Sequence, residues 1–416
     1  MRILVVILLL SFGAGAAGAQ DHPTGTRPTS GAARATGLLS EPSAMSNVIE
    51  SAGRWVDTEG STPKDGFYPA LNGSVTGAGW ISGGPGYRKH FLDGHALVDA
   101  SAAISWRAYK LAQARFELPD LARDRVTVGT LVRWQDLTQV NYFGLGAGSL
   151  DSQRSEYRLK DTDVLAYGAI KANNWLSIDG RFGWLKKPSL SASIGPFDGN
   201  YLDTLQVFAL DAGVTRPASF LHGDISVTAD TRDHPDYPTT GGLYRAGFGT
   251  YSDRDLGTFS FRRYEAEAVQ FLPIVEHAWV IALHGWGVFS DTSVGNSVPF
   301  YMLPTLGGGN TLRSYYDYRF HDRNLLLASA ESRVAVFSHV DAAVFVDAGN
   351  VAPRAGDLDL RKTSYGAGLR VHSRTSTIGR LDVAHGREGW LVFFKLSDPF
   401  GLARRSERAT VVPFVP

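Results

Sequence analysis

The sequence predicts an all-β protein, a sixteen-stranded antiparallel transmembrane β-barrel. Three observations lead to this prediction: polar and apolar residues alternate along most of the chain, tryptophans lie near the ends of the alternating segments, and short turns alternate with long loops. Of the 416 residues, 44% are hydrophobic and 20% are charged, which excludes disorder of the whole chain. Lys and Arg balance Asp and Glu at 41 each, so we expect no nucleic-acid partner.

The N-terminus has the pattern of an export signal. Arg2 supplies the positive charge, Ile3 to Leu10 an apolar run, and Ala17-Gly18-Ala19 a small-residue cleavage site. The apolar run is far shorter than the ~20 residues of a membrane-spanning helix, so we expect residues 1–19 to be a signal peptide. Residues 20–65 are rich in Pro, Gly, Ser, Thr and Ala, and we expect them to form a flexible periplasmic tether.

From residue 66 onward the chain alternates between polar and apolar residues. Within residues 96–108 every even position is apolar, whereas the odd positions include Asp99, Ser101 and Arg107. The segments approach the ~9 to 11 residues with which a tilted strand crosses a bilayer. One face of each strand is therefore predicted to meet lipid and the other a polar lumen. A soluble β-sandwich would alternate as well, so alternation alone favours a membrane barrel only modestly.

Two further patterns decide for the membrane barrel. Most tryptophans fall in predicted strands near an end, where an aromatic girdle lies; they are Trp80, Trp106, Trp134, Trp175, Trp184, Trp279, Trp286 and Trp390. Short turns such as Ser338-His339 alternate with long polar loops at residues 136–162, 187–221 and 290–324. Short periplasmic turns and long external loops are typical of outer-membrane barrels.

The pattern predicts a barrel over residues 66–398 and a periplasmic C-terminal tail over residues 399–416. The expected strands are residues 66–75, 78–88, 95–107, 109–118, 125–135, 163–171, 175–186, 222–230, 242–252, 258–271, 278–289, 325–337, 340–350, 362–372, 377–386 and 389–396. An even number of strands returns both ends of the barrel to the periplasm. A break in the alternation near Arg262-Arg263 predicts a β-bulge there.

The sequence shows no sign of catalytic chemistry. The absence of cysteine excludes disulfides, cysteine metal sites and a thiol nucleophile. Nucleophile elbows, His-Glu-x-x-His pairs, phosphate-binding Walker loops and dinucleotide fingerprints are absent as well. We therefore expect a non-enzymatic protein with no cofactor and no metal ion.

Four sequence blocks resemble a known family. They are DTRDHPDYPTTGGLYR (Asp230 to Arg245), LPTLGGGNTLRSYYDYRF (Leu303 to Phe320), LLLASAESR (Leu325 to Arg333) and VFVDAGNV (Val344 to Val351). In this order they resemble the outer-membrane assembly-factor superfamily, the barrels of the BamA and TamA type that are also called bacterial surface antigens. The resemblance covers roughly residues 66 to 400. It implies a barrel in the outer membrane of a Gram-negative-type cell that assists insertion or translocation of proteins. Members usually carry POTRA domains before the barrel, and we expect this chain to be a member without them.

The resemblance also implies a contact between the sixth external loop and the lumen. In the family this loop folds inward, and an Arg in an Arg-Gly-aromatic tip contacts acidic groups on the barrel wall. The tip matches Arg313 and Tyr315, with Ser314 in place of the family's Gly. Strand alternation independently places Glu331 and Asp347 on the lumen face, where a planar guanidinium can bind both carboxylates. The residues alone favour a solvated Arg313, with Glu331 paired to Arg333 or to another charge of the lumen.

The first and last strands are predicted to form a weak lateral seam. The first strand holds Pro69, Asn72 and Gly73, which lack a donor or disfavour an ordered strand. The last strand contributes Trp390 and Phe394. An open seam would expose strand edges that can pair with a strand of a client protein. The expected partners are therefore outer-membrane lipid, client outer-membrane proteins and a separate periplasmic protein. The alternative is an aqueous channel, or a structural or surface-antigen barrel without insertase activity.

Overall fold

The computed structural model describes residues 37–39, 41–43, 46–47, 49–51, 65–71, 82–195, 201–275, 278–396 and 398–400. The predicted signal peptide and most of the C-terminal tail lie outside these residues. Residues 35–416 form one compact unit, dominated by an 18-stranded sheet with a separate two-stranded sheet. No helix in the described part of the chain is both long and apolar enough to span a membrane.

The strands of the large sheet are bounded as follows: β1 (Gly66–Leu71), β2 (Ser82–Phe91), β3 (Ala96–Ser105), β4 (Lys110–Asp120), β5 (Val126–Tyr142), β6 (Ser155–Lys171), β7 (Leu176–Leu185), β8 (Ser189–Ala192), β9 (Leu202–Asp203), β10 (Phe220–Asp230), β11 (Gly241–Asp253), β12 (Phe261–Val275), β13 (Trp279–Thr292), β16 (Asn324–Phe337), β17 (Val340–Ala352), β18 (Lys362–His372), β19 (Thr377–Gly386) and β20 (Gly389–Lys395). The small sheet pairs β14 (Thr305–Leu306) with β15 (Phe320–His321). Short helical turns α2 (Leu121–Asp124) and α3 (Thr204–Val207) lie in connections.

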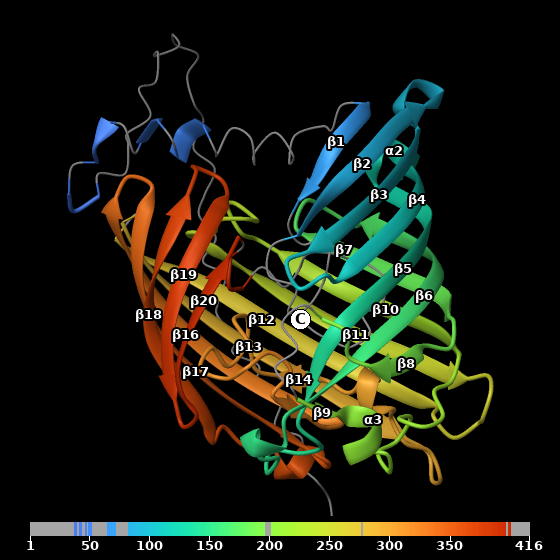
Figure 1. Ribbon diagram of the computed structural model, residues 1–416. Helices are drawn as coiled ribbons and strands as arrows, with labels where there is room; N and C mark the ends of the chain where they lie inside the picture. The colour runs from blue at the N-terminus through green and yellow to red at the C-terminus, as the bar shows by residue number, and fades with distance from the viewer. Residues whose placement is uncertain are drawn as a thin grey trace, which may run out of the picture. The chain divides into compact units, whose positions relative to one another are not determined.

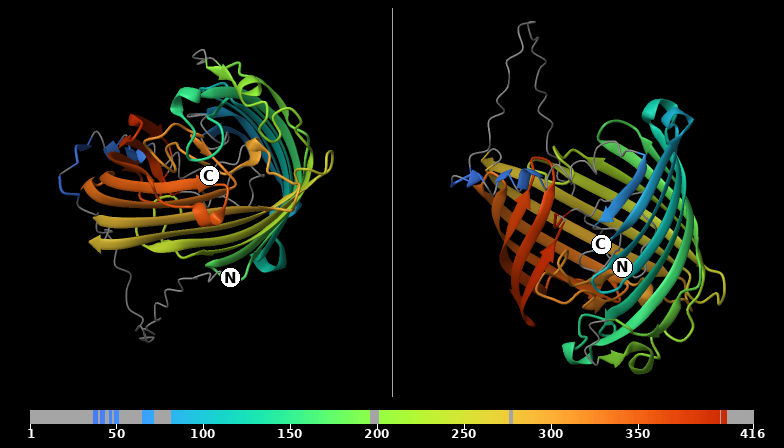
Figure 2. Two further views of the ribbon diagram at one scale, coloured as in Figure 1. Left: turned by 90° about the horizontal axis from the view of Figure 1, so that it is seen from below. Right: turned by 45° about the horizontal axis from the view of Figure 1, so that its top comes forward.

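The large sheet is an up-and-down meander. Consecutive strands pair antiparallel from β1 to β7, then through β10 to β13 and β16 to β20 (Figure 1). The short strands β8 and β9 add to the outer part of β6. The sheet curls so that its edge strands come round toward each other (Figure 2). The prediction of an all-β antiparallel fold is confirmed.

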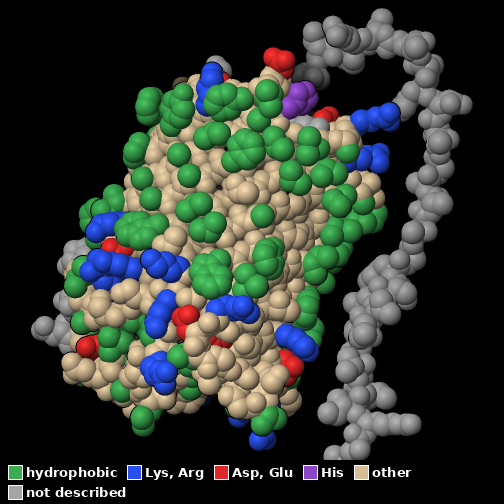
Figure 3. Space-filling model, turned by 90° about the vertical axis from the view of Figure 1, so that its right-hand side faces the viewer, with side chains coloured by type: hydrophobic (Ala, Val, Ile, Leu, Met, Phe, Trp, Pro, Cys, Tyr) green, Lys and Arg blue, Asp and Glu red, His purple; other side chains and the backbone are tan. Residues whose placement is uncertain are grey.

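Alternation along the strands separates an outer from an inner face. In β3 the side chains of Ala100, Ala102 and Ile104 are exposed, whereas Asp99 and Ser101, at the alternate positions, are buried. This pattern follows from the two-residue period of a strand, and it puts apolar residues outside, as Figure 3 shows for one face. The long connections lie at one end of the sheet, which we call the long-loop end. The turns after β2, β6, β10, β16 and β18 lie at the opposite end, which we call the short-turn end.

Two sequence-based expectations about strands are wrong. Strands β5 and β6 each have 17 residues and continue to Tyr142 and from Ser155, so the loop between them is much shorter than residues 136–162. The predicted bulge near Arg262-Arg263 is absent; the register of β12 with β13 shifts between Pro273 and Val275 instead.

Both errors have one physical cause. At the long-loop end the inner face of the sheet is apolar, because it packs against a hydrophobic cluster instead of water. Phe261 of β12 and Leu137 of β5 belong to that cluster together with Phe300 and Tyr301 of the β13–β16 loop. Arg263 therefore points inward in regular alternation, where it donates to the carbonyl of Met302.

Residues of the predicted tether contact the short-turn end. The amides of Leu38 and Leu39 donate to the carbonyls of Ala335 and Val336 at 3.1 and 2.9 Å. A Cβ on Gly37 would lie 2.6 Å from the Phe337 backbone, so the close approach requires glycine at that position. The Glu41 carboxylate lies 2.9 Å from Nδ1 of His339 in the β16–β17 turn.

Candidate functional site

The connection between β13 and β16, residues 293–323, folds into the interior of the sheet. Its hairpin β14–β15 packs against β17. Near the hairpin, Leu306, Leu312, Tyr315 and Phe320 are buried with residues of β13, β16 and β17 in a second apolar cluster. The apolar contacts of this connection, called loop 6 here, therefore extend over much of its length.

The tip of loop 6 is a tight turn that starts with glycines. Gly307 and Gly308 have φ angles of +117° and +93°, which only glycine adopts readily. The Gly308 amide donates to the Tyr315 carbonyl at 2.9 Å, and the Gly307 amide donates to Oγ1 of Thr311 at 2.9 Å. These hydrogen bonds close the turn and present Arg313 to the wall formed by β16 and β17.

Arg313 contacts two wall carboxylates. Its Nε and Nη2 donate to the two Asp347 oxygens at 3.0 and 2.8 Å, and its Nη1 donates to Glu331 at 2.6 Å. The guanidinium also lies 3.4 Å from the centre of the Phe345 ring. With its side chain 2% exposed, Arg313 is isolated from solvent. Burial alone would lower the pKa of the guanidinium, but the charges of Asp347 and Glu331 outweigh burial and raise it, so Arg313 stays protonated.

The contact belongs to a larger set of alternating charges. Arg370 of β18 donates to Glu331 at 2.8 Å and to Asp382 of β19 at 2.6 Å. Arg380 of β19 also donates to Asp382 at 2.6 Å, and its other nitrogen donates to the Gly309 carbonyl of loop 6 at 2.6 Å. We call Arg313, Glu331, Asp347, Arg370, Arg380 and Asp382 the loop 6 charge cluster. Its three cations are balanced by its three carboxylates, so that every buried charge has a partner of opposite sign.

Sequence reasoning identified Arg313, Glu331 and Asp347 but not the rest of this cluster. Glu331 pairs with Arg370, another charge of the lumen, as well as with Arg313, whereas Arg333 lies beside Asp398. Strand alternation had placed Arg370 on the lumen face. It could not tell that Arg370 lies level with loop 6, because alternation gives the face of a residue and not its partner on another strand.

Tyr315 and Ser314 lie away from the carboxylates. The Tyr315 ring packs edge-on against Phe320, with 5.1 Å between ring centres. The buried Ser314 side chain faces Gly386 of β19, where an added Cβ would come within 2.1 Å of its hydroxyl oxygen. Ser314 needs no positive φ, so serine fits where the family has glycine, provided that residue 386 remains glycine.

A second arginine joins loop 6 to two neighbouring loops. Arg319 donates from Nε to Glu388 of the β19–β20 loop at 3.0 Å and from Nη2 to the Ser149 carbonyl of the β5–β6 loop at 2.8 Å. Its guanidinium also lies over the Phe143 and Phe320 rings at 4.6 and 4.5 Å. Arg319 therefore connects loop 6 to loops from distant parts of the sheet.

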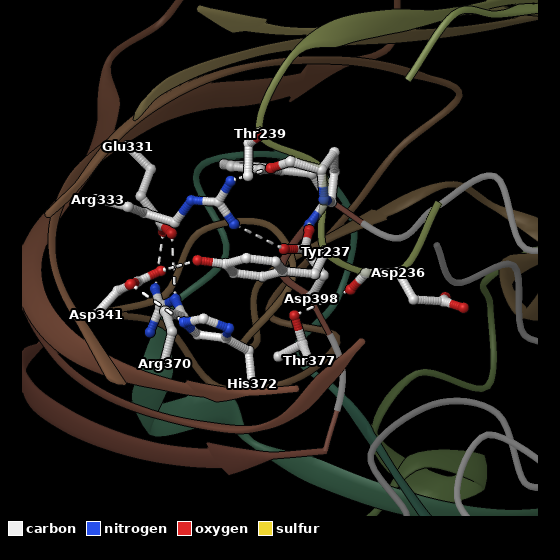
Figure 4. A network of polar contacts seen from close by, with 12 residues as sticks. Asp236, Tyr237, Thr239, Glu331, Arg333, Asp341, Arg370, His372, Thr377 and Asp398 are labelled. Atoms are coloured by element: carbon white, nitrogen blue, oxygen red, sulfur yellow. Dashed lines mark hydrogen bonds and ion pairs between the residues drawn. The ribbon is translucent and has the colours of Figure 1, made fainter. Parts of the chain in front are cut away.

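A polar cluster occupies the short-turn end of the interior (Figure 4). Tyr237, from the β10–β11 turn, donates to Asp341 of β17 at 2.7 Å and stacks on His372 of β18 with 3.8 Å between ring centres. Arg333 of β16 donates to the Pro238 carbonyl and lies 3.4 Å from Asp398, which follows the last strand. The β10–β11 turn and the segment after the last strand thus meet inside the sheet. The β10–β11 turn carries one of the sequence blocks, but nothing in its alternation predicted that it would turn inward.

The predicted seam residues lie on the two edge strands or outside the described residues. Pro69 is in β1 and lies opposite Pro85 of β2. Trp390 and Phe394 are exposed on β20 by 67% and 51%. Asn72 and Gly73 fall in residues 72–81, which the structure does not describe. Within the described residues, β1 pairs with β2 and β20 with β19, and no bridge joins β1 to β20.

The model of the Omp85 superfamily domain matches residues 97–386 of the chain. The chain belongs to the Omp85 superfamily. The membership recognised from the four sequence blocks is confirmed. Omp85 proteins are non-enzymatic transport or assembly barrels of the outer membrane that act on client proteins, so the expectation of a non-enzymatic outer-membrane barrel is confirmed too.

Solved structures agree on the fold. BamA from Haemophilus ducreyi lacking POTRA domains 1–3 is 15% identical with a TM-score of 0.57, over 79% of this chain and 68% of that one. CdiB from Escherichia coli is 13% identical with a TM-score of 0.51, over 80% of this chain and 63% of that one. No curated protein sequence matches this Omp85 chain. At such identities the likeness concerns the fold alone.

Proposed function

We propose that the chain inserts proteins into the outer membrane, or translocates them across it, through an opening between β1 and β20. The observation that carries this proposal is the pairing pattern: each of these two strands has one neighbour among the described residues. Unpaired strand edges can accept a strand of another protein by β-augmentation.

The composition and length of the edge strands support the same proposal. β1 has six residues and β20 has seven, against 17 in β5, so few hydrogen bonds can form between the edges. Pro69 of β1 also has no amide hydrogen to donate to a neighbouring strand. A contact between β1 and β20 is therefore expected to open at low cost.

We further propose that Arg313, Glu331 and Asp347 lock loop 6 in the lumen, with Tyr315 filling the apolar space beside them. The buried ion pairs of Arg313 support this role. The lock would keep the lumen occupied while the seam opens sideways, so a client would enter the membrane without a leak. A separate periplasmic protein is expected to deliver the clients.

Cysteine crosslinks test the opening. The chain has no native cysteine, so Phe67→Cys with Phe394→Cys, both near the short-turn end of their strands, would form a single disulfide across the seam when the two edges come together. In a deletion strain, the oxidised variant should fail to restore the outer-membrane protein content, and reduction should rescue it.

The matched control uses Leu381→Cys with Phe394→Cys. These residues are opposite each other in β19 and β20, so their disulfide lies beside the seam and leaves it free. It should complement the deletion in both redox states. Full complementation by the oxidised Phe67–Phe394 variant would refute opening at this seam.

Contacts at both ends of the interior favour this function over an aqueous channel. Loop 6 is buried at one end, and Tyr237 with Arg333 occupies the other. In planar bilayers we expect small, irregular conductance events. A steady conductance of porin size would favour the channel instead.

A further inference from the structure

Lys and Arg side chains gather on the outer face of the sheet toward the long-loop end (Figure 3). We call four cations near this end the outer cation cluster: Lys110 of β4, Arg158 and Lys160 of β6, and Lys186 directly after β7. Their positions face outward by the two-residue period: Lys110 has the parity of exposed Phe116, and Lys160 has that of exposed Val164. These charges therefore point to the membrane and not to the lumen.

Strand pairing makes the cluster compact. Lys110 of β4 is opposite Asp136 of β5, and Asp136 is opposite Lys160 of β6. Neighbouring strands lie ~4.8 Å apart, so this row spans about 10 Å. The Lys186 amide donates to the Thr162 carbonyl at 2.9 Å, two residues along β6 from Lys160. All four cations thus fall within reach of one anionic group of modest size.

A single buried carboxylate organises the cluster without neutralising it. Asp136 is 2% exposed; it accepts hydrogen bonds from Nε and Nη2 of Arg158 at 2.7 and 2.6 Å, and the Lys110 ammonium lies 3.8 Å away. Within the described part of the chain, no carboxylate lies within ion-pair distance of Lys160 or Lys186. The four cations thus retain a clear positive excess.

The outward positions next to the cluster fix its depth in the membrane. Trp134 precedes Asp136 by two residues, and Trp184 precedes Lys186 by two residues. Each tryptophan therefore lies next to the cluster on the side of the short-turn end. Both indoles are exposed, and tryptophan at a barrel surface marks the headgroup boundary. The cations lie immediately beyond that boundary on the side of the long loops, which face the cell exterior in outer-membrane barrels.

We propose that the outer cation cluster binds the phosphates of a phosphorylated glycolipid of the external leaflet, of the lipid A type. Arginine binds phosphate through two parallel N–H donors of its guanidinium, and lysine binds it as a point charge. Ser189 and Ser191 of β8 are opposite Lys160 and Arg158, and their hydroxyls can contact the sugar or phosphate oxygens. The site depends on the outer-membrane location and holds whether or not the seam opens.

Binding of diphosphorylated lipid A to the purified full chain in detergent tests the site. Lys160→Gln with Lys186→Gln should weaken binding at least tenfold. The control removes two charges from the exposed Arg125 and Lys171 of the short-turn end, as Arg125→Gln with Lys171→Gln, and should stay within twofold of wild type. The charge-preserving Lys160→Arg with Lys186→Arg should retain binding. Equal loss in the cluster and control variants, or no loss in either, would overturn the site.

Competing ligands define what the site recognises. Dephosphorylated lipid A and phosphatidylglycerol should each bind at least tenfold more weakly than the diphosphorylated lipid. Phosphatidylglycerol binding as tightly would overturn the glycolipid assignment, and dephosphorylated lipid A binding as tightly would overturn phosphate recognition. Displacement by equimolar inorganic pyrophosphate would show that free phosphate suffices and would overturn the lipid assignment. Wild-type heat-modifiability of each variant checks that the barrel is folded.

Discussion

Replacing Arg313 with alanine should release loop 6 from the sheet. Glu331 would keep its contacts with Arg370 at 2.8 and 3.1 Å. Asp347 would lose both of its charge-assisted bonds to Arg313, and no other cation in the described part of the chain bonds to it. Removing one partner of a buried ion pair costs about 3 to 5 kcal/mol. Since 1.4 kcal/mol is a factor of ten, the open form of the loop should rise at least about 100-fold.

Chymotrypsin cleavage after Tyr315 or Tyr318 under native conditions, with the cut sites identified from the fragment masses, measures that open form, because both side chains are 1% exposed while the loop is docked. Cleavage after Tyr316 is counted separately, because that side chain is 37% exposed in the docked loop. Arg313→Lys keeps the charge but loses the planar fork, so its cleavage rate should fall between those of wild type and Arg313→Ala. The exposed Arg354 lies in another loop, and Arg354→Ala should cleave like wild type.

A double-mutant cycle separates the ion pair from other effects of the substitution. If the cost arises because Asp347 is left buried without a cation, then Asp347→Asn should recover part of the stability lost in Arg313→Ala. The coupling free energy between the two substitutions should be about 1 to 3 kcal/mol. Wild-type cleavage of Arg313→Ala, or strict additivity in the cycle, would refute the reasoning.

Three further variants test other parts of the interior. Gly386→Ala would place a methyl group against Ser314 and should cost about 1 to 3 kcal/mol in unfolding free energy, measured by denaturation in detergent. Gly386→Ala with Ser314→Gly should regain only part of it, because the added Cβ also lies 2.9 Å from the Thr363 carbonyl. Tyr237→Phe removes the hydrogen bond to Asp341 and should cost about 1 to 3 kcal/mol; an unchanged denaturation midpoint would contradict the role of that turn. Burial and the adjacent Arg319 lower the pKa of His321 to about 3, so stability should fall as the pH drops below the unfolded value of ~6.5, by about 2 kcal/mol at pH 5. Melting midpoints from pH 7.5 to 5 should show the same slope in wild type and in the exposed-site control His95→Phe, but a smaller slope in His321→Phe.

The strands were predictable because membrane strands repeat one physical constraint. A strand residue in the bilayer faces either the lipid or the lumen. The alternation of apolar and polar residues in β3 and β18 follows these two environments directly. The prediction failed at the long-loop end, where Leu137 and Phe261 face inward against loop 6 instead of outward against lipid. There, apolar character no longer identifies the outer face.

The charge cluster was only partly predictable for a different reason. Arg313 was identified because the loop motif marks it, and Glu331 and Asp347 because the alternation of their strands places them on the lumen face. The partners Arg370 and Arg380 depend on the relative axial positions of β16, β18 and β19, and those follow from the register of each pair. Register is set by many weak contacts between strands, which a single sequence does not reveal.

The two sides of the proposed seam are held differently, and this asymmetry bears on how it would open. On the β20 side, β19 is tied to loop 6 through Arg380 and Gly309, and Glu388 is tied to Arg319. On the β1 side, the pairing of β2 with β3 skips Gly84 and Pro85, and Pro85 lies opposite Pro69, the proline of β1. A strand bound by several buried charges resists displacement more than one held by an interrupted ladder. The side that moves should therefore be β1 with β2, while the β16–β20 wall and loop 6 act as the fixed frame against which a client strand would pair.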